Sequence, residues 1–145
     1  MKILVDADAC PVKGIIVKVA KEFKIYCIMF VDTSHLINDG YSEVVTVDKS
    51  RDSVDIALIN KVSQGDIIVT QDFGVAAMAL ARGAKAINQN GLIYSDKNID
   101  RLLFERYLGQ KVRRSGGRTT GPQKRTKEDD IRFEQTLRSI LSHKS

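Results

Sequence analysis

The sequence is poor in the residues that cross-link small proteins through disulfides or zinc. It has two cysteines and two histidines among 145 residues, and their spacing is not that of a zinc site. Cys10 and Cys27 lie on or beside apolar segments, so we expect both to be buried free thiols. The carboxylates of Asp6 and Asp8 beside Cys10 oppose the lowered thiol pKa that a nucleophile needs.

The sequence also lacks a long hydrophobic run. Its longest apolar stretch, IYCIMFV at residues 25–31, has the length of a strand, whereas a transmembrane helix needs about 20 apolar residues. A secretory signal has a basic start and an apolar segment, whereas here a strand begins within residues 1–3. These features predict a cytoplasmic protein without a membrane partner.

Acidic residues do not balance the basic ones towards the end of the chain, where Lys and Arg are concentrated. Residues 111–145 contain ten Lys or Arg and four Asp or Glu, whereas residues 1–110 contain 13 and 14. The net charge of +5 therefore belongs to the last quarter of the chain. A basic tail beside an acidic cleft is typical of a nucleic-acid enzyme, and a solubilising tail is the open alternative.

Apolar strands alternate with amphipathic helices along the chain. We expect strands over residues 1–6, 25–31, 43–47, 66–70 and 84–88, and helices from about 11, 52, 74, 96 and 126. The helix at 96–108 has an apolar side that includes Ile99, Leu102, Leu103 and Tyr107, and a mobile loop over 109–125 follows it. This alternation predicts an α/β fold, a three-layer α/β/α sandwich with a mostly parallel sheet of four to five strands.

Two aspartates mark the end of the first strand. Asp6 and Asp8 are two residues apart, so their side chains point the same way at the carboxyl end of a parallel sheet, where α/β folds bind ligands. Like charges held that close need a cation or a proton. The alternative is that one of them caps the helix near Pro11.

Further carboxylates are expected at the same sheet end. Asp52 and Asp55 share one face of a first helical turn, and Asp72 directly follows a strand. Together with the first pair they predict a site for Mg²⁺ or Mn²⁺, and two such ions about 4 Å apart suit phosphodiester hydrolysis. Alternatively, Asp52 and Asp72 are helix caps and Asp55 is a favourable charge on a helix dipole.

Two other aspartates have different expected places. Asp32 follows the second strand and could join the site from that crossover. Asp66 precedes a strand, so we expect it at the opposite end of the sheet as a turn residue.

Four segments, in order, resemble the YaiI/YqxD family of uncharacterised bacterial proteins. They are DADACP at 6–11, the D-x-x-D of 52–55, GDIIVTQD at 65–72 with the small-residue helix after it, and GGRTTGP at 116–122. The resemblance covers nearly the whole chain. That family is regarded as related to PIN and similar nuclease-like domains, which implies a PIN-like α/β domain over residues 1–110. Residues 111–145 then form a basic Gly/Arg-rich loop and an amphipathic helix packed on the same domain.

The resemblance also implies a site. The acidic positions of such a site match Asp6, Asp55 and Asp72 in this sequence, and Asp8 and Asp52 are added or alternative ligands. PIN ribonucleases usually carry an acidic residue soon after the equivalent of Asp72, but here residues 73–75 are Phe, Gly and Val, and Asn90 is the nearest polar candidate.

The leading hypothesis is a Mg²⁺- or Mn²⁺-dependent nuclease that acts on RNA. Its catalytic residues are Asp6, Asp8, Asp55 and Asp72. The residues assigned to backbone phosphates are basic and lie near the acidic pair or in the tail: Lys13, Arg113, Arg114, Arg118, Lys124 and Arg125. The lack of an aromatic run predicts weak sequence preference.

Two alternatives remain open. One is a non-catalytic nucleic-acid-binding or regulatory module with the same fold. The other is a phosphatase of the haloacid dehalogenase type, with Asp6 as nucleophile and Asp8 as acid/base. A homo-oligomer that pairs through the last helix is compatible with each.

Overall fold

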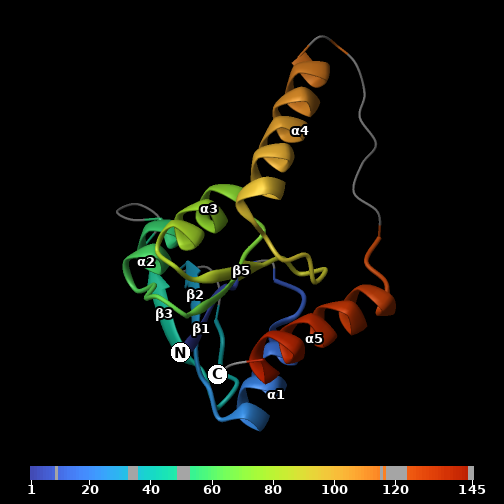
Figure 1. The fold of residues 1–145 in the computed structure, drawn as a ribbon. Helices are drawn as coiled ribbons and strands as arrows, with labels where there is room; N and C mark the ends of the chain where they lie inside the picture. Colours follow the sequence, from blue (N-terminus) through green and yellow to red (C-terminus); the bar gives the residue numbers. More distant parts are fainter. Residues whose placement is uncertain (9, 33–35, 49–52, 115, 117–123, 144–145) are drawn as a thin grey trace.

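Strands and helices follow one another in the order expected for an α/β protein (Figure 1). The computed structural model describes residues 1–8, 10–32, 36–48, 53–114, 116 and 124–143. The strands are β1 (Lys2–Asp6), β2 (Tyr26–Asp32), β3 (Glu43–Val47), β4 (Ile67–Val69) and β5 (Lys85–Ile87). The helices are α1 (Lys13–Phe23), α2 (Val54–Asn60), α3 (Phe73–Ala81), α4 (Asp96–Arg114) and α5 (Lys127–Ser142).

Within the described residues, the strands form one five-stranded sheet in the order β3-β2-β1-β4-β5, and every pair of neighbouring strands is parallel. Starting from β1, the chain adds β2 and β3 on one side of this strand and then β4 and β5 on its other side. The strand order therefore reverses between β1 and β4. In open α/β sheets, the ligand crevice lies at such a reversal, outside the carboxyl ends of the strands.

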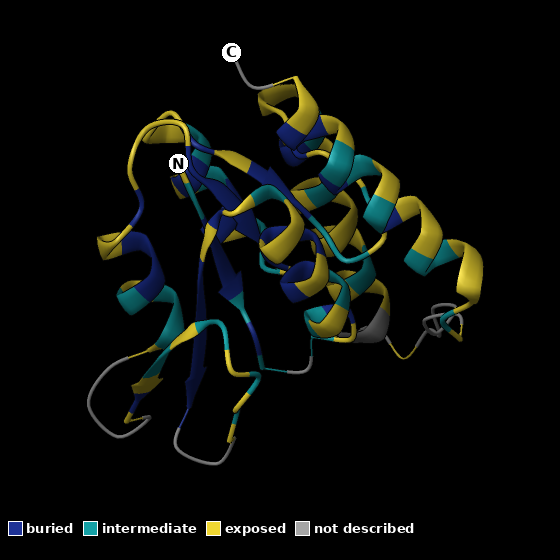
Figure 2. Ribbon diagram, turned by 90° about the horizontal axis from the view of Figure 1, so that it is seen from below, coloured by how far each residue is buried: buried dark blue, intermediate teal, exposed yellow. Residues whose placement is uncertain are grey.

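Helices cover both faces of this sheet. One apolar cluster joins α1 and α5 to the sheet, with Ile16, Phe133 and Leu137 against alternate strand residues. The other joins α2, α3 and the first turn of α4 to the opposite face, with Leu58 and Ile99. Figure 2 shows the strands as a dark blue, buried layer between helices whose outer sides are exposed. The α/β fold class and the three-layer sandwich predicted from the sequence are confirmed.

Helix α1 begins without a side-chain cap. Its N-cap is Val12, no side chain bonds to the free N–H groups there, and its first turn has no acidic residue. The alternative in which Asp6 or Asp8 caps this helix is therefore wrong. Both carboxylates are left for other interactions.

Helix α4 is longer than the sequence pattern predicted. The expected mobile loop begins at residue 109, but the helix continues to Arg114. Most residues of its second half are good helix formers, so propensity can sustain the helix where little is buried. Ile99 is buried, whereas Leu103 and Tyr107 are 40% and 51% exposed. The sequence predicted that these two side chains lie on the same apolar side as Ile99. That prediction is wrong, because they are outside the buried side of α4.

Helix α5 starts at the predicted capping box. The Thr126 hydroxyl accepts a bond from the Asp129 N–H, and the Asp129 carboxylate accepts one from the Thr126 N–H. The helix lies beside α1 in Figure 1. A bidentate pair between Arg138 and Glu22 joins the two helices above their apolar contact. None of the helices in the described ranges is long and apolar enough to cross a membrane.

Asp66 lies at the amino end of the sheet, as predicted for a turn residue. It is 2% exposed, and its carboxylate accepts bonds from the Lys2 ammonium at 2.6 Å, the Lys2 N–H at 3.1 Å and the Ser63 N–H at 2.8 Å. These bonds tie β1 to the turn before β4. The charge of Asp66 is therefore neutralised within the fold.

Substituting Asp66 with alanine should destabilise the protein. The change leaves the Lys2 ammonium and two backbone N–H groups without their acceptor, so we expect a loss of about 2–4 kcal/mol in the free energy of unfolding. Urea denaturation measures this loss. The exposed Asp96→Asn serves as the control and should change stability by less than about 0.5–1 kcal/mol. Equal stability of Asp66→Ala and wild type would contradict this role.

Candidate functional site

The reversal of strand order brings two acidic segments together. Asp6 is the last residue of β1, and Thr70, Gln71 and Asp72 follow β4, which pairs with β1. The Thr70 hydroxyl donates to the Asp6 carboxylate at 3.2 Å and accepts a bond from the Asp72 N–H at 3.0 Å. One threonine thus links the two aspartates at the expected crevice.

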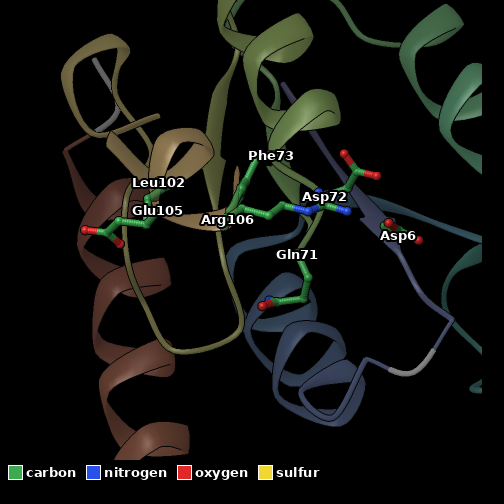
Figure 3. A pocket seen from close by; sticks show the side chains of 7 residues that line it. All are labelled: Asp6, Gln71, Asp72, Phe73, Leu102, Glu105 and Arg106. Atoms are coloured by element: carbon green, nitrogen blue, oxygen red, sulfur yellow. The ribbon is translucent and has the colours of Figure 1, made fainter. Parts of the chain in front are cut away.

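An open cleft of about 980 Å³ lies at this position (Figure 3). It has an acidic side, an apolar strip and one basic side chain, and its lining residues are Asp6, Gln71, Asp72, Phe73, Leu102, Glu105 and Arg106. The first four come from the ends of β1 and β4 and the start of α3, and the rest come from α4. The cleft is therefore bounded by the strand ends and by a helix that reaches over them.

Asp6 is the electrostatic centre of the site. Partial burial is the main cause that raises the pKa of its carboxyl to about 6, against an ordinary 3.8. The hydrogen bond from Thr70 lowers it, and the charges of Asp55, Asp8 and Asp72 each raise it. Three further carboxylates thus lie close enough to act on Asp6.

Asp55 and Asp72 form a pair beside Asp6. Asp55 lies in the first turn of α2, and burial, then the charge of Asp72 and a side-chain hydrogen bond to it, raise the pKa of Asp55. Asp72 is also the N-cap of α3, and its Oδ1 accepts bonds from Gly74 and Val75 N–H at 2.8 and 3.1 Å. Both cap bonds use Oδ1, so Asp72 serves the cap and the acidic cluster at the same time.

Asp8 lies close enough to Asp6 to raise the pKa of its carboxyl, but it does not line the large cleft. Its carboxylate accepts a bond from the Asp32 N–H at 3.2 Å, and it lines a separate cavity of about 30 Å³ with Asp6, Cys10 and Gln89. Asp32 is 2% exposed at the end of β2. Asp8 therefore adjoins the site through Asp6 rather than through the cleft.

The remaining predicted ligand is Asp52, and it lies outside the described residues. The N-cap of α2 is Ser53, whose hydroxyl accepts a bond from the Ile56 N–H. The alternative in which Asp52 caps α2 is therefore wrong.

The described carboxylates do not form a closed metal cage. Among residues that the structure describes, no group of three or more His, Cys, Asp or Glu is placed to hold a metal ion. Mg²⁺ is usually held by one or two carboxylates together with water and substrate phosphates, so a partial donor set suits it. Burial, and then the charges of neighbouring carboxylates, raise the pKa of Asp6 and Asp55, and hard oxygen donors in such an environment fit a divalent cation chemically.

Arg106 is the cleft residue that the sequence reasoning missed. In Figure 3 its guanidinium points towards Asp72 and Asp6, whereas the Glu105 carboxylate points away from them. The sequence contains the signal, because Arg106 is four residues after Leu102 and therefore on the same side of α4. Gln71 was also missed, since a polar residue after a strand has no distinctive spacing.

The basic residues expected to bind phosphate fall into three groups. Lys13 is half-buried and lines a different cavity, beside Ile37 and Asp39. Lys124 is exposed. Arg113 and Arg114 belong to the last turn of α4, where the side chains are not described, and Arg118 lies outside the described residues.

Arg125, which the sequence analysis assigned to phosphate binding, is bonded within the fold instead. Its guanidinium is held by the Asp130 carboxylate, the Asn90 side-chain oxygen and the Gln89 carbonyl, each at 2.7 Å. These bonds fasten the start of α5 to the loop after β5. Arg125 is thus engaged as a structural residue, and Asn90 is bound to it rather than placed at the cleft.

The environment of Cys10 does not favour a nucleophile. Cys10 and Cys27 are free thiols, partly and fully buried respectively. Burial raises the pKa of both, and that of Cys27 reaches about 11. The expectation for these two residues holds, except that Cys10 keeps some exposure.

Asp6→Asn should stabilise the metal-free protein at neutral pH. The raised pKa means that the fold favours the protonated carboxyl, so the stability linked to Asp6 is full below about pH 3.8 and is lost as the pH rises through about 6. At about pH 7.5 with a chelator, we expect a gain of about 1–2 kcal/mol, allowing for solvent screening.

Thermal or urea unfolding at two pH values tests this expectation. At about pH 3.5 the two proteins should be equally stable, because Asp6 is then neutral. A variant that is destabilised by the same amount at both pH values would show that Asp6 has only a structural role.

These observations define an α/β protein with an acidic cleft at the strand-order reversal of a parallel sheet. The family model "Uncharacterized BCR, YaiI/YqxD family" matches residues 4–143. A UPF0178 protein of Ruminiclostridium cellulolyticum is 67% identical over 145 residues, covering 100% of this chain and 95% of the relative. The chain therefore belongs to the YaiI/YqxD family.

More distant relatives match over similar lengths. A UPF0178 protein of Exiguobacterium sibiricum is 43% identical over 145 residues, which cover 100% of this chain and 99% of the relative. Among solved structures, a point mutant of Rae1 (YacP) from Bacillus subtilis has 16% identity and a TM-score of 0.47, with 98% of each chain covered. That score is too low to carry an argument about function.

Proposed function

We propose that this protein is a divalent-metal-dependent nuclease that hydrolyses phosphodiester bonds, with RNA as its substrate. The observation that carries the proposal is the meeting of Asp6, Asp55 and Asp72 from three crossovers at one end of the sheet. Their charges oppose one another without a basic residue bonded to them among the described residues. A divalent cation would reduce the repulsion between these carboxylates, and the bound cation would in turn attract a phosphate group of the RNA.

Asp6, Asp55 and Asp72 would hold Mg²⁺ or Mn²⁺, with Asp8 and Asp52 as further candidates. Bound there, the metal would activate water and neutralise charge on the phosphate. The protein groups around it have separate tasks. Thr70 orients the Asp6 carboxylate, and the cap bonds to Gly74 and Val75 fix Asp72.

Arg106 supplies the opposite charge across the cleft. It extends from α4 towards Asp72 and Asp6 (Figure 3), and a guanidinium binds phosphate oxygens well because of its planar set of donors. The other basic candidates, Lys13, Lys124, Arg113, Arg114 and Arg118, would contact backbone phosphates outside the cleft. Such contacts are independent of sequence and sensitive to salt.

A non-catalytic RNA-binding module is the second candidate. It is favoured by the incomplete metal-binding geometry of the described residues and by Phe73, Gly74 and Val75, which follow Asp72 without an acidic residue. In this case Arg106 and the tail would still bind RNA. The two candidate functions therefore predict a difference in RNA cleavage but the same affinity for RNA.

Cleavage of a labelled single-stranded RNA should require both a divalent ion and Asp55. With Mn²⁺ or Mg²⁺ we expect cleavage that a chelator abolishes, and Asp55→Asn should lower its rate by at least about 100-fold, because it removes a metal-binding oxygen. Asp96→Asn, at an exposed carboxylate on α4, is the matched control. RNA affinity without cleavage in any metal would favour the binding module.

Arg106→Ala should weaken RNA binding in the presence of a chelator. Losing one charge-assisted phosphate contact is expected to cost about 5- to 10-fold in affinity and to reduce the salt slope by about one. Fluorescence anisotropy at several salt concentrations measures both. Arg101→Ala removes an exposed arginine of the same helix, which pairs with Glu105 at 4.0 Å, and should have a smaller effect. Equal losses in the two variants would place the RNA away from the cleft.

A further inference from the structure

The outer face of α4 is apolar and uncovered. Leu103, Phe104, Tyr107 and Leu108 are 40%, 59%, 51% and 44% exposed. At 100° per residue these four positions lie on one side of the helix, away from the side that carries Ile99, Leu102 and Arg106. Figure 1 shows the second half of α4 standing clear of the sheet and of the other helices. The helix therefore has a second apolar face, which the described part of the chain does not bury.

Charges flank this face in a particular order. Asp96 and Asp100 precede the apolar residues on the same stripe, at helical spacings of four and three, and Lys111 follows Tyr107 by four. All three charged residues are exposed. The Lys111 ammonium lies 5.6 Å from the centre of the Tyr107 ring, on the same side of the helix. Lys97 is also exposed on this side of the helix. Along the stripe, an amino-terminal end with two acidic residues and one basic residue is therefore net acidic, the middle is apolar, and the carboxyl-terminal end carries Lys111.

A stripe with this order is complementary to itself when reversed. We propose that two copies of this protein form a dimer through antiparallel pairing of their α4 helices. A two-fold axis at the level between residues 105 and 106 sets Asp100 of one copy against Lys111 of the other, and in the same register Leu103 against Leu108 and Phe104 against Tyr107. Antiparallel pairing also sets the helix dipoles in opposite directions, which is favourable. A parallel pair would instead place like charges together.

The size of the face sets the strength expected of this dimer. A helix of 19 residues is about 28 Å long, and a helix pair of that length buries less than the roughly 1,600 Å² of a standard stable interface. The dimer should therefore dissociate on dilution. Its interface leaves the cleft open, because Arg106 and Leu102 lie on the other side of α4.

Sedimentation velocity on the full chain tests the proposal by charge reversal. Wild type should change from monomer to dimer between about 5 and 300 µM at low salt. Asp100→Lys and Lys111→Asp should each weaken the dimer by at least about 10-fold, since each sets like charges opposite one another. The double variant should return to within about three-fold of wild type. Phe104→Glu should abolish the dimer.

A matched control keeps these outcomes interpretable. Lys127→Asp makes the same change of charge as Lys111→Asp, at an exposed residue in the first turn of α5, and should leave the dimer intact. Circular dichroism establishes that every variant is folded. The proposal is overturned if wild type stays monomeric up to about 300 µM, or if a dimer forms that neither single reversal weakens. Failure of the double variant to recover would likewise exclude this antiparallel register.

Discussion

The reversal of strand order between β1 and β4 is the constraint on which the site depends. Strand β1 lies in the middle of the sheet and leads to α1 on one face, while β4 leads to α3 on the other, so the two connections diverge at the carboxyl ends of these strands. The chain there consists of Asp6 on one side and Thr70, Gln71 and Asp72 on the other. Their hydrogen bonds through Thr70 hold two aspartates at an opening that reaches solvent.

The charge of Asp6 is balanced differently from that of Asp66, a buried aspartate at the opposite end of the sheet. At the amino end of the sheet, Asp66 is neutralised by Lys2 and by backbone N–H groups. At the carboxyl end, partial burial and, to a smaller extent, the charges of neighbouring carboxylates raise the pKa of Asp6. A fold that neutralises one aspartate and leaves another opposed by its neighbours has a reason at the second position other than stability. The cation binding proposed above would balance this charge.

Much of the fold could be predicted because it follows local patterns. Strand and helix periodicity located the elements, and strand ends located Asp6 and Asp72. Other features depend on distances that a sequence does not contain. The apolar pattern of the sequence predicted that α4 ends at residue 108, although good helix formers continue the helix to Arg114. Arg125 resembled other tail arginines, yet three acceptors hold it. Arg106 was recognisable only once α4 had been placed over the strand ends.

The most direct test of the metal site is calorimetry of Mn²⁺ binding at about pH 6, in two buffers that differ in ionisation enthalpy. Because metal binding needs ionised carboxylates, wild type should bind Mn²⁺ and release protons, given that the pKa of Asp6 is about 6. Asp6→Asn and Asp72→Asn should bind far more weakly, and Asp6→Asn should lose that proton release. Absence of binding to wild type, or equal binding by all three proteins, would contradict the account and leave an acidic cleft without a metal.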